Sequence, residues 1–171
     1  RLAKLVDLSL RLNGFAGWAQ VHAVGASEQA GTARLVFSDS FSGGGTVALS
    51  GGADDGRSGV DCRLVVLDEM FADPAYRPDV IKMDVEGHEG RALRGMRRML
   101  ERAPGVRIMM EFVPEMMARS GVMASEVAAM LGGIGLQPWM IDDALAGMGW
   151  DQLLAEASGI QNILVARDAP A

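Results

Sequence analysis

Hydrophobic positions along this chain change repeatedly between a helical and an extended spacing. At the start, Leu2, Leu5 and Leu8 recur three positions apart, which places them on one face of a helix. The pair Asn13-Gly14 follows shortly afterwards and supplies residue types that end helices. The first segment is therefore predicted to be a helix with one apolar face.

Short apolar runs bounded by glycine, proline and polar residues predict strands along the rest of the chain. Helical spacing returns between several of them. One example is a segment in which Leu93, Met96 and Leu100 share one face and arginines follow the other, which we interpret as a solvated face. The predicted strands are residues 21–24, 32–38, 46–50, 60–67, 80–85, 106–112, 136–141 and 161–166. The predicted helices after the first are residues 67–71, 89–102, 124–131 and 150–157.

The order of these elements predicts the fold class. Strands that alternate with helices are typical of an α/β fold with a mostly parallel sheet covered by helices on both faces. Residues 32–38 and 46–50 have no helix between them, so they predict a β-hairpin inserted after the first strand. At 171 residues, of which 49% are apolar, the chain is long enough to bury one core. We expect a single domain over residues 1–171.

The strand at residues 80–85 ends in polar residues that a buried strand does not need. Because side chains alternate along a strand, Asp84 either leaves the sheet at its tip or is buried unpaired at a large cost in free energy. Ligands of open α/β sheets lie beyond the carboxyl ends of the strands, so Asp84 and Glu86 predict a site there. Glu111 follows the next apolar run in the same way, and it either orients a substrate or binds backbone amides.

Two further polar residues follow in the same segment. His88 is a candidate for acid–base chemistry because imidazole titrates near neutral pH, but it serves equally well as a residue that caps the turn. Glu89 begins the predicted helix, where a carboxylate interacts favourably with the positive end of the helix dipole. We therefore favour a structural role for Glu89 and leave both roles of His88 open.

The charge of the chain restricts its partners. A net charge of −6 disfavours nucleic acid and anionic membranes, because their phosphates require a basic protein surface. The single cysteine, Cys62, excludes an internal disulfide. No apolar run is long enough to span a bilayer, and no signal peptide is recognisable. We expect a cytoplasmic protein.

The segment "VIKMDVEGHEGRALRGMRRML…PGVRIMMEF" closely resembles the central motif of the FkbM-type S-adenosylmethionine-dependent methyltransferases. In that motif a strand of the type I-K-x-D-x-E-G precedes a glutamate, a helix with leucine and glycine, and a strand that ends in glutamate. "RLNGFAGWAQVHAVGASEQAGTARL" and "QNILVAR" also resemble family segments, so the resemblance spans nearly the whole chain. His88 departs from the small residue often found at its position. The matching residues are Ile81, Lys82, Asp84, Glu86, Gly87, Glu89, Leu93, Gly95 and Glu111.

The resemblance implies a class I methyltransferase sheet, which is Rossmann-like, and S-adenosylmethionine as the cofactor. In such enzymes the first strand with its glycine-rich turn, and an acid after the second strand, hold much of the cofactor. Neither is recognisable in residues 1–171. The resemblance therefore implies a partial domain that lacks the first two strands, is inactive by itself, and has open sheet edges through which chains could associate. The residues expected at the adenine edge are Val24, Gly25, Ala26 and Ser27.

The family also implies a reaction, which is methyl transfer to a hydroxyl of a small molecule such as a sugar or natural product. On this interpretation Asp84, Glu86 and His88 are the catalytic candidates, Asp84 also contacts the cofactor, and Glu111 lies on the substrate side. No metal is required. The residues alone leave two alternatives: a Mg²⁺-dependent phosphoryl-transfer or hydrolytic site built from Asp84, Glu86 and Glu111, or a binding module without catalysis.

Overall fold

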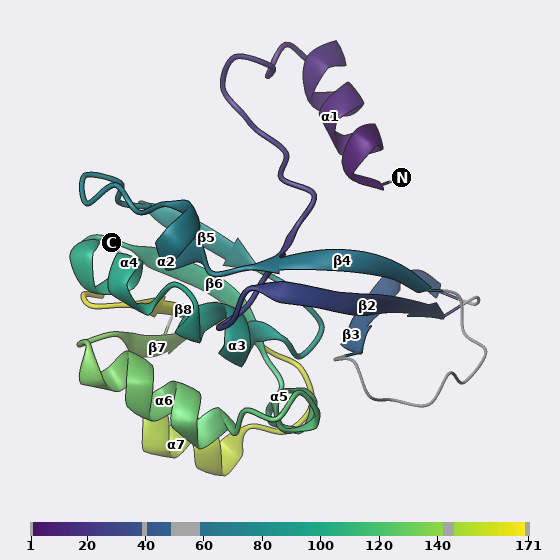
Figure 1. Cartoon of the computed structure of the whole chain (residues 1–171). Helices are drawn as coiled ribbons and strands as arrows, with labels where there is room; N and C mark the ends of the chain where they lie inside the picture. Colours follow the sequence, from purple (N-terminus) through teal and green to yellow (C-terminus); the bar gives the residue numbers. More distant parts are fainter. Residues whose placement is uncertain (1, 39–40, 49–58, 142–145, 170–171) are drawn as a thin grey trace.

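The fold is built on two separate four-stranded sheets (Figure 1). The computed structural model describes residues 2–38, 41–48, 59–141 and 146–169. Among these residues, each sheet contains one parallel pair of strands and two antiparallel pairs. The α/β class is confirmed, but the predicted single, mostly parallel sheet is not found.

The first sheet has the strand order β1-β4-β2-β3. Its strands β2 and β3 pair antiparallel, which confirms the predicted β-hairpin, and β1 pairs parallel with the end of β4. The predicted strand at residues 21–24 is wrong by a few positions, because the residues level with the end of β4 are Gly25 and Ala26. Part of the predicted strand 46–50 lies outside the described residues. The strands are β1 (Gly25–Ala26), β2 (Gly31–Ser38), β3 (Phe41–Ala48) and β4 (Gly59–Val65).

The second sheet has the strand order β5-β6-β8-β7. Strands β5 and β6 run parallel, whereas β8 lies antiparallel between β6 and β7. All four strands were predicted from their apolar runs, although the first of them ends at Met83 and leaves Asp84 and Val85 beyond the sheet. The strands are β5 (Val80–Met83), β6 (Arg107–Phe112), β7 (Gln137–Met140) and β8 (Gln161–Ala166).

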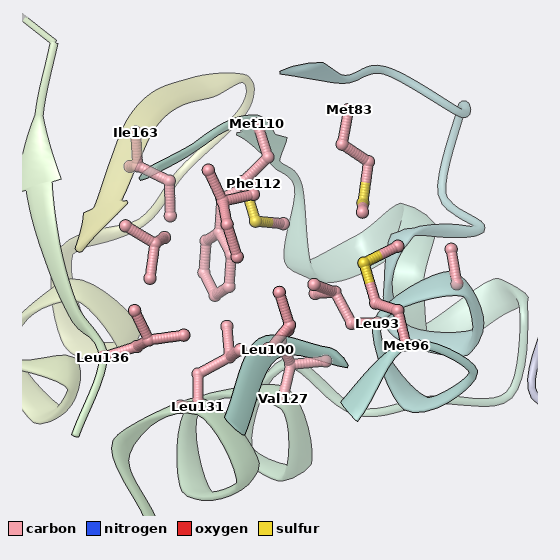
Figure 2. Packing of buried hydrophobic residues seen from close by; sticks show 14 of the residues in the cluster. Met83, Leu93, Met96, Leu100, Met110, Phe112, Val127, Leu131, Leu136 and Ile163 are labelled. Atoms are coloured by element: carbon pink, nitrogen blue, oxygen red, sulfur yellow. The ribbon is translucent and has the colours of Figure 1, made fainter. Parts of the chain in front are cut away.

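One face of the second sheet carries the hydrophobic core (Figure 2). Met110 and Phe112 of β6 pack in the same cluster as Leu93, Leu100 and Leu131, and all five side chains are buried. Removing this apolar surface from water is the main favourable term in folding. Most of the helical part of the cluster comes from α3 (Glu89–Arg94), α4 (Arg97–Arg102), α6 (Ala124–Gly133) and α7 (Trp150–Glu156), and Met117 of α5 (Pro114–Arg119) also belongs to it.

The opposite face of the second sheet is open at β5 and β6. Val80 is 63% exposed and Met109 is 40% exposed, and Lys82 also faces solvent. Helices were predicted on both faces of the sheet. In the part of the chain that the structure describes, these side chains stay uncovered, so the prediction of a second helical layer is not confirmed.

The predicted helix at residues 89–102 is divided into α3 and α4. A Cβ at Gly95 would overlap the backbone carbonyl of Ser27, so the chain passes α3 at that point too closely for a side chain. The short helix α2 (Leu67–Met70) lies beside the break, and its Asp68 carboxylate accepts the N–H groups of Arg98 and Met99 at 3.0 and 2.7 Å. Asp68 thus satisfies free amides at the start of α4, as an N-terminal cap does.

Helix α1 (Leu2–Leu12) lies at the periphery of the fold. It confirms the first prediction and ends shortly before Gly14, whose φ of 79° is typical of the residues that follow a helix. It stands apart from both sheets in Figure 1, and none of its residues is buried. Helix α5 (Pro114–Arg119) was missed, although proline at a first helical position is a recognised start signal. Across the described residues, no helix has the length and apolar content needed to cross a membrane.

Candidate active site

Two acidic residues lie level with each other at the ends of β5 and β6. The register pairs Met83 with Met110, so Asp84 and Glu111 are the next residues along these two parallel strands. Asp84 is exposed, which confirms that it leaves the sheet at its tip. Its carboxylate lies 3.8 Å from the Nζ atom of Lys82, and both side chains are about half exposed. An ion pair of that kind contributes little to stability, so Asp84 keeps its capacity to bind a ligand.

The chain reverses immediately after Asp84 in a tight turn at residues 85–88. The N–H of His88 donates to the carbonyl of Val85 at 3.1 Å, and the two central residues, Glu86 and Gly87, have φ values of 53° and 92°. Positive φ at both central positions is the pattern of a type I′ turn. Glycine is required at the second position, because a Cβ there would also lie 2.8 Å from the carbonyl oxygen of Met116.

Glu86 is the residue of this turn whose conformation is costly. Among the described residues it is the only one other than glycine with positive φ, and such a conformation costs about 1–3 kcal/mol for a residue with a side chain. Burial raises the pKa of Glu86, and the charges of Asp84, Glu111 and Glu89 raise it further. The turn therefore gathers carboxylates at one edge of the second sheet and makes one of them a stronger base.

His88 points away from these acids into the protein. It is 4% exposed, and its Nε2 atom lies 3.3 Å from the Oγ atom of Ser27, which is 2% exposed. Burial lowers the pKa of His88, Arg91 lowers it further, and Glu28 acts in the opposite direction. The ring is therefore uncharged at neutral pH, and although His88 precedes α3, its side chain makes no capping hydrogen bond.

The segment predicted to line the adenine edge lies against α3. Its members Gly25 and Ala26 form β1, Val24 precedes them, and Ser27 continues along β4 by donating its N–H to the carbonyl of Val65 at 2.9 Å. Because Ser27 also contacts His88, the structure brings this segment and the acidic turn together. The hydroxyl of Ser27 is directed to the histidine, so any ligand contact of Ser27 would come from its backbone.

Glu28, the residue that follows this segment, forms ion pairs with α3 that the sequence did not predict. The carboxylate of Glu28 accepts hydrogen bonds from Arg91 and from Arg94, and the side chains of all three residues are at most one-third exposed. The predicted solvated arginine face is confirmed for Arg98, whose side chain is 66% exposed. It is wrong for Arg91 and Arg94, which bind Glu28. The spacing of the two arginines on one helix indicated that both could bind the same acid. Nothing in the local sequence indicated that this acid is a glutamate more than sixty positions earlier.

The positions of the acids bear on the metal-dependent alternative. Within the described ranges, no three His, Cys, Asp or Glu side chains converge closely enough to hold a metal ion. The alternative that built a Mg²⁺ site from Asp84, Glu86 and Glu111 therefore gains no support from their geometry.

An α/β chain with acids at the ends of neighbouring parallel strands has the arrangement in which such folds bind small ligands. The sequence model of a known family, described as the Methyltransferase FkbM domain, matches residues 3–132. This match covers most of the chain, which therefore belongs to the FkbM methyltransferase family, as its central motif predicted. Searches of curated proteins and of solved structures found no match.

Proposed function

We propose that the protein is an S-adenosylmethionine-dependent methyltransferase that methylates a hydroxyl group of a sugar or another natural product. The family match supports methyl transfer. The observation that carries the proposal is the group of acids around Asp84 and Glu86 beside the segment that ends in Ser27.

The chemistry of these side chains fits the cofactor. Carboxylates accept hydrogen bonds and attract cations, and S-adenosylmethionine offers an ammonium group, ribose hydroxyls and a cationic sulfonium. Asp84 is exposed and would hold the cofactor's amino-acid end, while the backbone of residues 24–27 would flank the adenine. When bound, the cofactor supplies an electrophilic methyl group.

The acids would then act on the acceptor. Transfer to a hydroxyl forms an oxygen–carbon bond and releases the hydroxyl proton, which a carboxylate within reach can accept. Glu86 is suited to this step because its raised pKa brings its basicity closer to neutral pH. Glu111 would orient the acceptor from the neighbouring strand. The burial of His88 supports a role in positioning the turn rather than in proton transfer.

The experiment compares methyl transfer by the wild type and by Asp84→Asn, in the protein that carries residues 1–171, with labelled S-adenosylmethionine and a panel of hydroxylated acceptors. We expect at least about a tenfold loss, the order expected when one positioned polar group is removed from a reacting centre. Asp79→Asn is the matched control, because Asp79 is also exposed but lies at the opposite end of β5.

Full turnover by Asp84→Asn on the true acceptor would refute the role of Asp84. Absence of both cofactor binding and methyl transfer in the wild type would favour the binding module that the residues alone left open.

A further inference from the structure

Glu89 is buried although it begins a helix. It is 3% exposed, whereas Glu69, in the first turn of α2, is exposed. A carboxylate that only complements a helix dipole gains nothing from burial, and burial of a charged group without a partner is unfavourable. Helix α3 is also only six residues long, which limits any dipole effect. Another interaction must offset the burial of Glu89.

That interaction is with the turn that precedes the helix. The Oε1 atom of Glu89 accepts the backbone N–H of Val85 at 3.2 Å. The register between β5 and β6 ends with Met83 and Met110, so Val85 lies beyond the strand pairing that would otherwise accept its N–H. The carbonyl of Val85 accepts the N–H of His88, and the two bonds together fix both backbone groups of Val85.

We propose that Glu89 is a positioning residue, which holds the turn at residues 85–88 so that Asp84 and Glu86 are presented together at the edge of the second sheet. A residue with positive φ keeps that conformation only where the surroundings impose it, and the bond from Val85 to Glu89 supplies such a constraint next to Glu86. The catalytic meaning of this role rests on the proposed function, whereas the structural role does not.

The test compares Glu89→Gln with Glu89→Met. Glutamine has a side chain of the same length with an oxygen that can accept the bond, whereas methionine has a similar size but no such oxygen. Amide hydrogen exchange at Val85 is measured in both. We expect roughly a tenfold faster exchange in Glu89→Met, in line with the loss of one hydrogen bond, and near-wild-type exchange in Glu89→Gln. Glu69→Gln is the control for the loss of a first-turn acid.

A carboxyl NMR titration of Glu86 in Glu89→Gln provides a second readout. The charge of Glu89 contributes to the raised pKa of Glu86, so this pKa should fall when the charge is removed and should not change in Glu69→Gln. Unchanged exchange at Val85 in Glu89→Met would overturn the proposal. Equal acceleration in the Gln and Met variants would overturn it too, because it would show that only the charge matters.

Kinetics separate this proposal from the proposed function. If the protein transfers methyl groups, Glu89→Met should lower kcat about tenfold with little change in the KM for S-adenosylmethionine, and Glu89→Gln should restore most of the rate. A wild type without methyl transfer would contradict the proposed function but would leave the exchange and titration results to decide the role of Glu89. Wild-type kcat in Glu89→Met would contradict a catalytic contribution.

Discussion

At the scale of single residues, both the conformation and the charge of Glu86 oppose the stability of the fold, and Glu86 lies in the proposed active site. Its φ of 53° is unfavourable for any residue with a side chain, and neighbouring carboxylates raise its pKa. Neither property improves the fold. Such strained and mutually repelling groups are typical of functional sites, where they are retained because the chemistry needs them.

Replacement of Glu86 should therefore raise stability and lower activity. The pKa of Glu86 is raised above its ordinary value of 4.5, so its ionisation destabilises the folded state as the pH rises through the folded pKa. We expect Glu86→Gln to unfold at a higher denaturant concentration than the wild type near neutral pH, and this difference should vanish below about pH 4.

Glu86→Gly tests the strain separately, because a side chain disfavours positive φ and glycine has none. It should exceed Glu86→Gln in stability by up to about 1 kcal/mol at every pH, because relief of the strain is partly offset by the backbone entropy of glycine. Denaturant titrations at both pH values measure these effects. A wild type as stable as both variants at neutral pH would contradict the strain and the charge repulsion.

At the scale of elements, the break between α3 and α4 lets the first sheet approach the second. Gly95 has no side chain, and its carbonyl accepts the N–H of Asp68 at 2.8 Å while Ser27 passes on the other side. The helical spacing of Leu93, Met96 and Leu100 correctly predicted which face is buried. It could not predict the break, because the residues that contact Gly95 there, Ser27 and Asp68, lie far away in the sequence.

Gly95→Ala should loosen this contact. A methyl group there would overlap the carbonyl of Ser27, and overpacking of this kind costs about 1–3 kcal/mol. We expect a lower midpoint of chemical denaturation and faster amide exchange in residues 25–28. Gly133→Ala is the control, because Gly133 lies at the end of a helix, as Gly95 does, but a Cβ there would meet no atom within 4 Å. Equal stability of the two variants would show that the approach of Ser27 does not constrain the fold.

At the scale of the whole molecule, local sequence signals predicted the strands better than their arrangement. Apolar runs identified β5, β6, β7 and β8, and the acid at the end of β5 was correctly placed beyond the sheet. The antiparallel direction of β8 has no local signal, since it depends on the path of the chain through α7 and not on the composition of the strand. The contacts of Ser27 with His88 and of Glu28 with the arginines of α3 were missed for the same reason.

The open edge of the second sheet is a candidate surface for association with another chain. β5 is the terminal strand of its sheet, and among the described strands it pairs only with β6, while Val80 is largely exposed. Unpaired edges can recruit another strand, so association with a second chain through this edge stays a prediction.

In the proposed function, the segment at residues 24–28 and the turn at residues 85–88 with its flanking acids belong to one cofactor site. Amide hydrogen exchange with and without S-adenosylmethionine is the decisive measurement, in the protein that carries residues 1–171. We expect slower exchange in both segments when the cofactor is bound, and no change at residues 104–107, at the opposite end of the second sheet. Protection confined to other parts of the chain, or no protection at concentrations that support methyl transfer, would contradict this proposal.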